Sequence, residues 1–167
     1  MKIPKTRRTS CHVSKPISTN AEYLIGIDCG TSTGLAIWNI AKQEFVSIET
    51  LTLHRAFDKV KNFFETVSMN TLVFIENPKT FVPFAQKIGA KQVNIAARVQ
   101  GAGSIKRDFA AWEDFFNDYK FPFVPTSIIG GKKKVDAVLF EKITGVKYRT
   151  SEHARDAALI VFNRKTF

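Results

Sequence analysis

Three acidic residues and one histidine occupy positions from which they could act together on a phosphate ester. Asp28 and Glu76 each close a short apolar run, LIGID and LVFIE, as the last residue of a buried strand would. His153 and Asp156 lie three residues apart in a segment with helical spacing, so they share one helix face. Carboxylates gathered this closely repel one another unless a cation lies between them. Mg²⁺ and Mn²⁺ prefer oxygen ligands, and two such ions roughly 4 Å apart promote phosphodiester hydrolysis.

Each of these four residues also has a simpler interpretation. An Asp before Cys-Gly is often a turn former, a Glu before Asn-Pro a solvated strand end, and a helical His an ordinary surface or core residue. Asp156 could pair with Arg155 or with a lysine of the preceding loop. Glu152 could replace Asp156 as a ligand, although the helix dipole also favours an acid in the first turn. The occurrence of all four in one chain favours the metal site.

The elements that must position these residues follow from hydrophobic periodicity. β-rich runs predict strands at 23–28, 34–40, 45–53, 71–75 and 121–126, and helical spacing predicts helices within 54–68, 84–119, 135–143 and 151–162. This order predicts one α/β domain with a mixed five-stranded sheet, three antiparallel strands followed by parallel ones, and helices on its faces. If the first and fourth strands are neighbours, Asp28 and Glu76 end at the same edge.

Composition points to a polyanionic partner. The chain has 167 residues, with 25 Lys and Arg against 15 Asp and Glu, and a net charge of +10; such a surplus is typical of nucleic-acid-binding proteins. Residues 1–20 hold five of the basic residues and no acid, which predicts a flexible basic arm before a domain at 21–167. A mitochondrial-type transit peptide is the alternative for this arm, but its prolines and its lack of an amphipathic stripe weigh against it.

The two cysteines, Cys11 and Cys29, form neither a disulfide framework nor a zinc motif. We therefore expect a reducing compartment, the cytoplasm or a DNA-containing compartment such as the mitochondrial matrix. No apolar run of about 20 residues occurs, so no transmembrane helix is predicted.

Five blocks of the sequence resemble successive motifs of RuvC-type Holliday junction resolvases, which belong to the RNase H-like superfamily. The blocks are LIGIDCGTSTGLAIW (24–38), LVFIENP (72–78), RVQGAGSIKRDF (98–109), IIGGKKKVDAV (128–138) and EHARDAALIV (152–161). The resemblance spans about residues 22–163 and implies an RNase H-like nuclease domain. It further implies that Asp28, Glu76, His153 and Asp156 hold two Mg²⁺ ions, for which Mn²⁺ can substitute, and that a homodimer resolves four-way DNA junctions by symmetric paired nicks.

The same resemblance implies groups that contact DNA. An aromatic wedge follows the Glu of the fourth strand, and basic residues contact phosphates; the candidates are Phe81 or Phe84 for the wedge, and Lys79, Arg107, Lys132, Lys133 and Lys134 for the phosphates. Core packing is the alternative for either phenylalanine, and a solvated charge run for the loop lysines. The small-residue helix around 96–109 would form the dimer interface, whereas Phe109, Trp112 and Phe116 are equally well explained as core.

Three rival functions fit parts of the sequence. The string GIDCGTSTG is also similar to the phosphate-binding turn of sugar kinases and actin-like ATPases, but those enzymes need two such domains. YqgF-like nucleases, proposed to act on RNA, share the first motif, although IENP and the His-x-x-Asp pair favour the resolvases. A non-catalytic nucleic-acid-binding module would have no use for four metal-ligating residues in this order.

Overall fold

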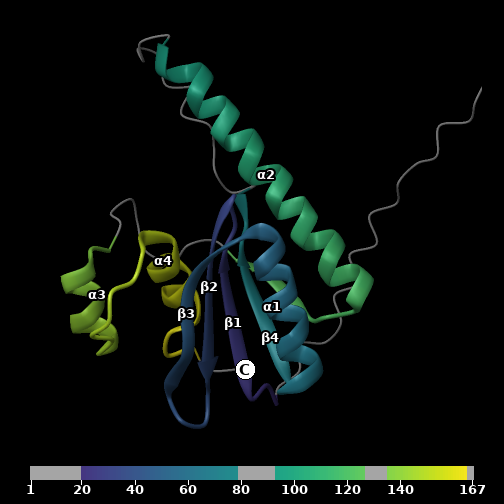
Figure 1. Ribbon diagram of the computed structural model, residues 1–167, viewed down its shortest axis with the longest axis vertical. Coiled ribbons are helices and arrows are strands. Elements are labelled where there is room, and N and C mark those ends of the chain that lie inside the picture. Colours follow the sequence, from purple (N-terminus) through teal and green to yellow (C-terminus); the bar gives the residue numbers. More distant parts are fainter. Residues whose placement is uncertain (1–19, 79–92, 127–134, 165–167) are drawn as a thin grey trace, which may run out of the picture.

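The computed structural model describes residues 20–78, 93–126 and 135–164. Its elements follow the predicted order (Figure 1): β1 (Tyr23–Asp28), β2 (Ser32–Asn39), β3 (Glu44–Thr52), α1 (Leu53–Thr66), β4 (Thr71–Glu76), α2 (Val93–Tyr119), β5 (Phe123–Thr126), α3 (Ala137–Thr144) and α4 (Glu152–Val161). The basic arm and residues 84–92 of the predicted second helix lie outside the described residues.

The five strands form one mixed sheet in the order β3-β2-β1-β4-β5. The first three strands pair antiparallel, whereas β4 lies parallel to β1, and β5 lies parallel to β4. The prolines of the fifth strand predict an edge position, which the sheet order confirms. The fold is thus α/β with an RNase H-like layout, as the sequence predicts.

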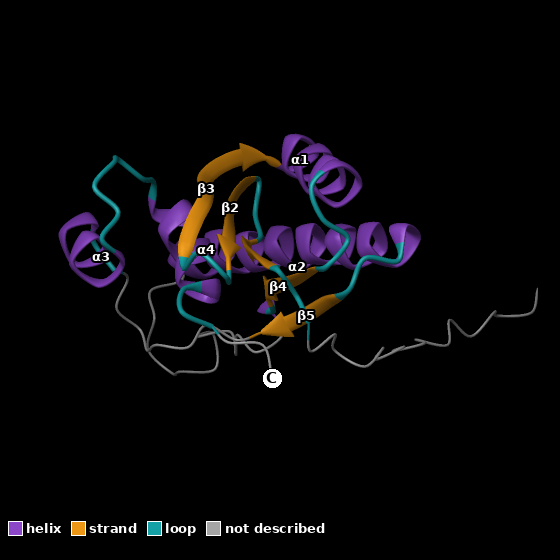
Figure 2. Cartoon of the chain, turned by 90° about the horizontal axis from the view of Figure 1, so that it is seen from below, coloured by secondary structure: helices purple, strands orange, loops and turns teal. Residues whose placement is uncertain are grey.

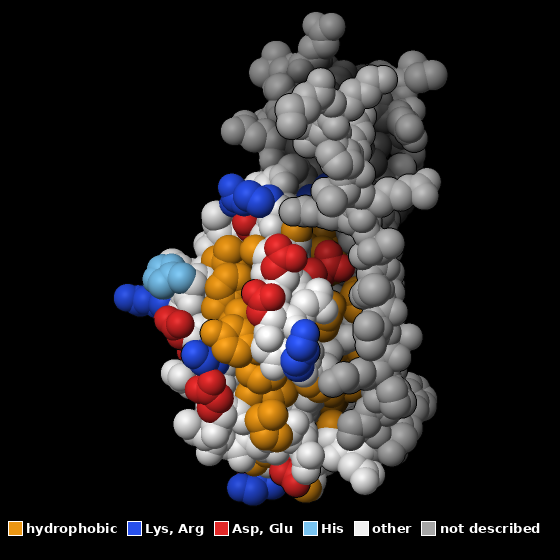
Figure 3. Space-filling model, turned by 90° about the vertical axis from the view of Figure 1, so that its right-hand side faces the viewer, with side chains coloured by type: hydrophobic (Ala, Val, Ile, Leu, Met, Phe, Trp, Pro, Cys, Tyr) orange, Lys and Arg blue, Asp and Glu red, His pale blue; other side chains and the backbone are white. Residues whose placement is uncertain are grey.

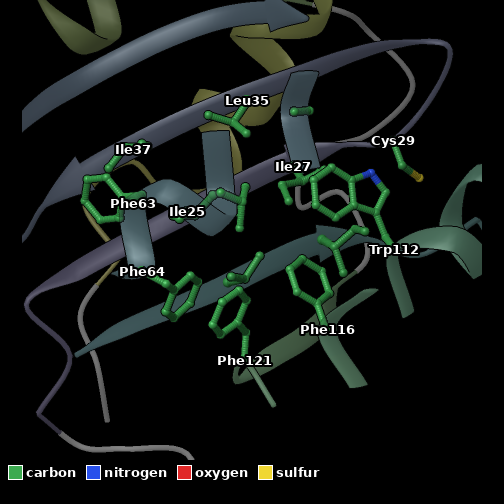
Figure 4. Packing of buried hydrophobic residues seen from close by; sticks show 14 of the residues in the cluster. Ile25, Ile27, Cys29, Leu35, Ile37, Phe63, Phe64, Trp112, Phe116 and Phe121 are labelled. Atoms are coloured by element: carbon green, nitrogen blue, oxygen red, sulfur yellow. The ribbon is translucent and has the colours of Figure 1, made fainter. Parts of the chain in front are cut away.

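Helices cover both faces of the sheet (Figures 1 and 2). α1 and α2 lie on one face, and α4 lies on the other with α3 beyond it. The core under α1 and α2 is strongly aromatic (Figure 4), and Phe64, Trp112 and Phe116 are fully buried in it. The stripe of aromatic residues along α2 is therefore core, the alternative that the sequence left open.

Side-chain caps define where the last two helices begin. Asp136 accepts a hydrogen bond from the backbone N–H of Leu139 at 2.8 Å, and Ser151 accepts one from that of Ala154 at 3.1 Å. α3 ends at Gly145, whose φ of 75° is the left-handed conformation that glycine adopts readily. Ser151 is thus the N-cap of α4.

Two positions on predicted apolar faces are exposed. Val67, expected on the buried face of α1, lies just beyond the last helical residue. Ile105, expected in the stripe of α2, is 40% exposed. Within the described ranges, no helix is both long and apolar enough to span a bilayer.

Candidate metal centre

The two strand-ending carboxylates lie at the same edge of the sheet. In the parallel pair of β1 and β4, Ile27 is the register partner of Ile75, so Asp28 and Glu76 come next on adjacent strands. Side chains alternate between the two faces of a strand. Leu24 lies four residues before Asp28, Phe74 lies two residues before Glu76, and both pack in the core on the α4 side. Both carboxylates therefore face α4 as well. The prediction that Asp28 and Glu76 end together is confirmed.

Two glycines bring α4 into direct contact with this part of the sheet. A Cβ at Gly34 would lie 1.9 Å from the carbonyl oxygen of His153, and a Cβ at Gly26 would lie 2.2 Å from that of Ala157. The α4 backbone therefore occupies the space that side chains on β1 and β2 would need. This packing places the first turn of α4 beside the end of β1, and sequence reasoning missed both glycines.

His153 and Asp28 form the central contact of the site. Nδ1 of His153 lies 2.8 Å from Oδ2 of Asp28, and the two side chains are 46% and 12% exposed. An ionised carboxylate only accepts hydrogen bonds, so Nδ1–H of the imidazole is the donor. Nε2 of a neutral imidazole is then the nitrogen with a lone pair, which can accept a proton or bind a cation.

Asp156 lies one turn after His153 on α4 and is half-buried. One predicted alternative, an ion pair with Arg155, is not formed: that guanidinium donates to the carbonyl oxygens of Val135 at 3.1 Å and Thr150 at 2.6 Å. Among the described residues, no hydrogen bond or ion pair reaches the Asp156 carboxylate. Glu152, the alternative ligand, is exposed in the first turn of the helix.

The pKa of the buried Cys29 thiol depends on the charges at this edge of the sheet. Its Sγ donates to the backbone carbonyl of Glu76 at 3.5 Å, across the ends of β1 and β4. Burial, together with the negative charges of Glu76, Asp28 and Asp108, raises the pKa of this thiol to about 12. Several carboxylates thus act on one buried point, and a cation would relieve their mutual repulsion.

The donors at this edge suit a hard divalent cation in type and position, but they do not close around one. Among the described residues, no three His, Cys, Asp or Glu side chains are close enough together to hold one ion. The structure brings His153 to Asp28, and Asp28 to the same edge as Glu76.

Of the predicted DNA contacts, only Arg107 is described. Its side chain is 69% exposed on α2, and its Nε and Nη2 donate to Oδ1 of Asp108 at 3.0 and 2.8 Å. The other candidates, Phe81, Phe84, Lys79, Lys132, Lys133 and Lys134, lie outside the described residues.

Comparison with known proteins adds no identification. No protein-family model matches the sequence. No curated protein matches it either.

Proposed function

We propose that this chain is a metal-dependent endonuclease that resolves four-way DNA junctions by paired nicks. The observation that carries the proposal is the arrangement of Asp28, Glu76 and His153. Two carboxylates end adjacent parallel strands on the same face, and the helix docked on that face presents an imidazole 2.8 Å from one of them. This arrangement matches the order and spacing of the motifs that resemble the resolvases.

The residues present can hold a cation and move a proton. Asp28, Glu76 and Asp156 would supply oxygen ligands, and a bound Mg²⁺ or Mn²⁺ supplies positive charge against the phosphodiester. Asp28 orients the His153 ring through Nδ1–H, which leaves Nε2 to accept the proton of an attacking water. The water oxygen then bonds to phosphorus as the P–O bond breaks, and the leaving oxygen takes up a proton from solvent.

The charge distribution is consistent with DNA as the substrate. The chain carries a net charge of +10, half of it within residues 1–20. On the face formed by α1 and α2 (Figure 3), acidic and hydrophobic side chains are interspersed, and no continuous basic surface covers the described part of that face. We therefore infer that DNA approaches the end of the sheet where β1 and β4 finish, beside Arg107.

Symmetric cutting of a four-way junction requires two active sites, so we also propose a homodimer. The N-terminal half of α2 extends beyond the sheet (Figure 1), and its small residues at 96–103 would allow close approach of a second copy. Analytical ultracentrifugation tests this: we expect a mass of twice 18.8 kDa.

The function is tested with a synthetic four-way junction beside linear duplex, flap and RNA–DNA hybrid. Each substrate is incubated with Mg²⁺, with Mn²⁺ and with a chelator. We expect paired symmetric nicks in the junction with either metal and none with the chelator. Metal-dependent cutting of all substrates would instead identify a broader RNase H-like nuclease, such as a YqgF-like enzyme. Binding without cutting would identify a non-catalytic module.

A further inference from the structure

A buried carboxylate on α2 has no role in the metal centre described above. Asp108 is 1% exposed and is the first buried side chain among those described along α2. Its Oδ1 accepts two hydrogen bonds from Arg107, whereas its Oδ2 is buried and has no hydrogen-bond partner among the described residues. An unpaired oxygen of a buried carboxylate is costly, so such atoms usually have a water or an ion as partner.

Asp108 lies at the end of the sheet that carries the metal centre. Trp112, one turn further along α2, belongs to the same buried cluster as Cys29, and its indole edge is turned toward that residue (Figure 4). Cys29 in turn contacts the backbone of Glu76. The charge of Asp108 is also close enough to act on the Cys29 thiol, together with the charges of Asp28 and Glu76.

The three carboxylates lie on two different sides of the sheet at this edge. Asp28 and Glu76 face α4, whereas Asp108 belongs to the α2 layer on the other side of the sheet. The three do not meet within reach of one ion. Mg²⁺ keeps several of its waters when it binds to one or two carboxylates, and those waters need acceptors.

We propose that Oδ2 of Asp108 accepts hydrogen bonds from the water shell of a divalent cation held by Asp28 and Glu76. This inference rests on the proposed metal-dependent function. Asp108 is then a positioning residue that closes the cation site on the α2 side, and its bond to Arg107 holds a basic side chain beside the same site. Residues that hydrogen-bond to the ligands of a metal ion typically contribute about 10- to 100-fold to metal affinity.

The test is a Mn²⁺ titration followed by the electron paramagnetic resonance signal of the free ion. The full chain is compared with Asp108→Asn and with Asp114→Asn, an exposed control on the same helix. We expect Asp108→Asn to weaken Mn²⁺ binding about 10- to 100-fold, with little change in Asp114→Asn. The Mn²⁺ concentration for half-maximal junction cleavage should rise in parallel, with the rate restored at saturating Mn²⁺.

A thermal melt without metal separates this role from a structural one. We expect Asp108→Asn to unfold at the same temperature as the wild type or higher, because the amide removes a buried negative charge. If the Asp108→Asn variant does not fold, Asp108→Ser is measured in its place. Unchanged Mn²⁺ affinity in Asp108→Asn, or an equal loss in Asp114→Asn, would overturn the role of Asp108 and leave the proposed nuclease intact. Absence of Mn²⁺ binding in the wild type would overturn both.

Discussion

The hydrogen bond between His153 and Asp28 assigns different tasks to the two nitrogens of the imidazole. Nδ1 is held by the carboxylate, so the proton-accepting position is Nε2, on a ring that is 46% exposed. The resemblance to junction resolvases gives this position as Asp or His. The structure adds a physical reason for the histidine, since a carboxylate 2.8 Å from Asp28 would repel it in the absence of a cation.

His153→Ala should lower the rate of junction cleavage by about 100-fold or more, because it removes a general base. His54→Ala is the matched control, since His54 is exposed on α1 and lies outside the site. Single-turnover cleavage at saturating Mg²⁺ measures both variants. Equal rates for the two variants would exclude a catalytic role for His153.

The raised pKa of Cys29 makes stability depend on pH. The thiol keeps its proton up to about 12 in the folded chain, against 9.0 in the unfolded chain. The unfolded state therefore releases a proton first as the pH rises above 9.0, and stability is lost across this window at up to about 1.4 kcal/mol per pH unit. Urea unfolding should show the wild type losing stability relative to Cys29→Ala between pH 8 and pH 10.5. Parallel curves would contradict the burial of a neutral thiol.

The packing of α4 on β1 and β2 decides whether the site forms at all. Both strands have a glycine under the helix backbone, which allows His153 and Asp156 to approach the sheet end. The short contact between the hydroxyls of Thr50 and Ser151 also ties the start of α4 to β3. The site therefore depends on how α4 packs against the sheet, as well as on its four side chains.

Gly34→Ala should displace the first turn of α4, because its Cβ would lie 1.9 Å from the carbonyl oxygen of His153. We expect a loss of about 3 kcal/mol in the free energy of unfolding, at the upper end for overpacked cores, and loss of cleavage. Gly30→Ala is the control in the same turn, since its Cβ would meet only Ser32 O at 3.8 Å. Urea unfolding and the junction assay measure both. A fully active Gly34→Ala would show that α4 does not need this close approach.

The sequence predicts the elements and the pairing of Asp28 with Glu76, because apolar runs ending in a carboxylate are visible along the chain. The close approach of α4 is not visible in this way, because it depends on side chains that Gly26 and Gly34 lack. The sequence does not single out Asp108, because this residue lies between Arg107 and Phe109 in a polar stretch. Its spacing of four residues from Trp112 places it on the aromatic face of α2, and this is the signal that could have identified it.

At the level of the whole molecule, net charge and the geometry of the carboxylate edge would make separate contributions to the proposed activity. The arm and the basic loops would add affinity for any nucleic acid, whereas the carboxylate edge would decide whether a bound strand is cut. The described part of the face over α1 and α2 mixes acidic with hydrophobic side chains (Figure 3), so a surface that binds DNA would have to lie on other parts of the chain.

Removal of residues 1–19 should weaken DNA binding without changing the cleavage rate at saturating protein. Five basic residues are lost, so the slope of log K against log salt should fall by up to about 4 to 5. Binding isotherms on a junction at several salt concentrations measure this slope. An unchanged slope would show that the arm does not contact DNA.

The most direct measurement of the central claim is cleavage and binding of a four-way junction by Asp28→Asn. The control is Asp58→Asn, an exposed carboxylate on α1. If Asp28 holds the cation and orients His153, the variant binds the junction with nearly wild-type affinity but does not cut it with Mg²⁺ or Mn²⁺, while Asp58→Asn cuts normally. Cleavage by Asp28→Asn at a rate near that of the wild type would contradict a metal centre at the end of β1 and β4.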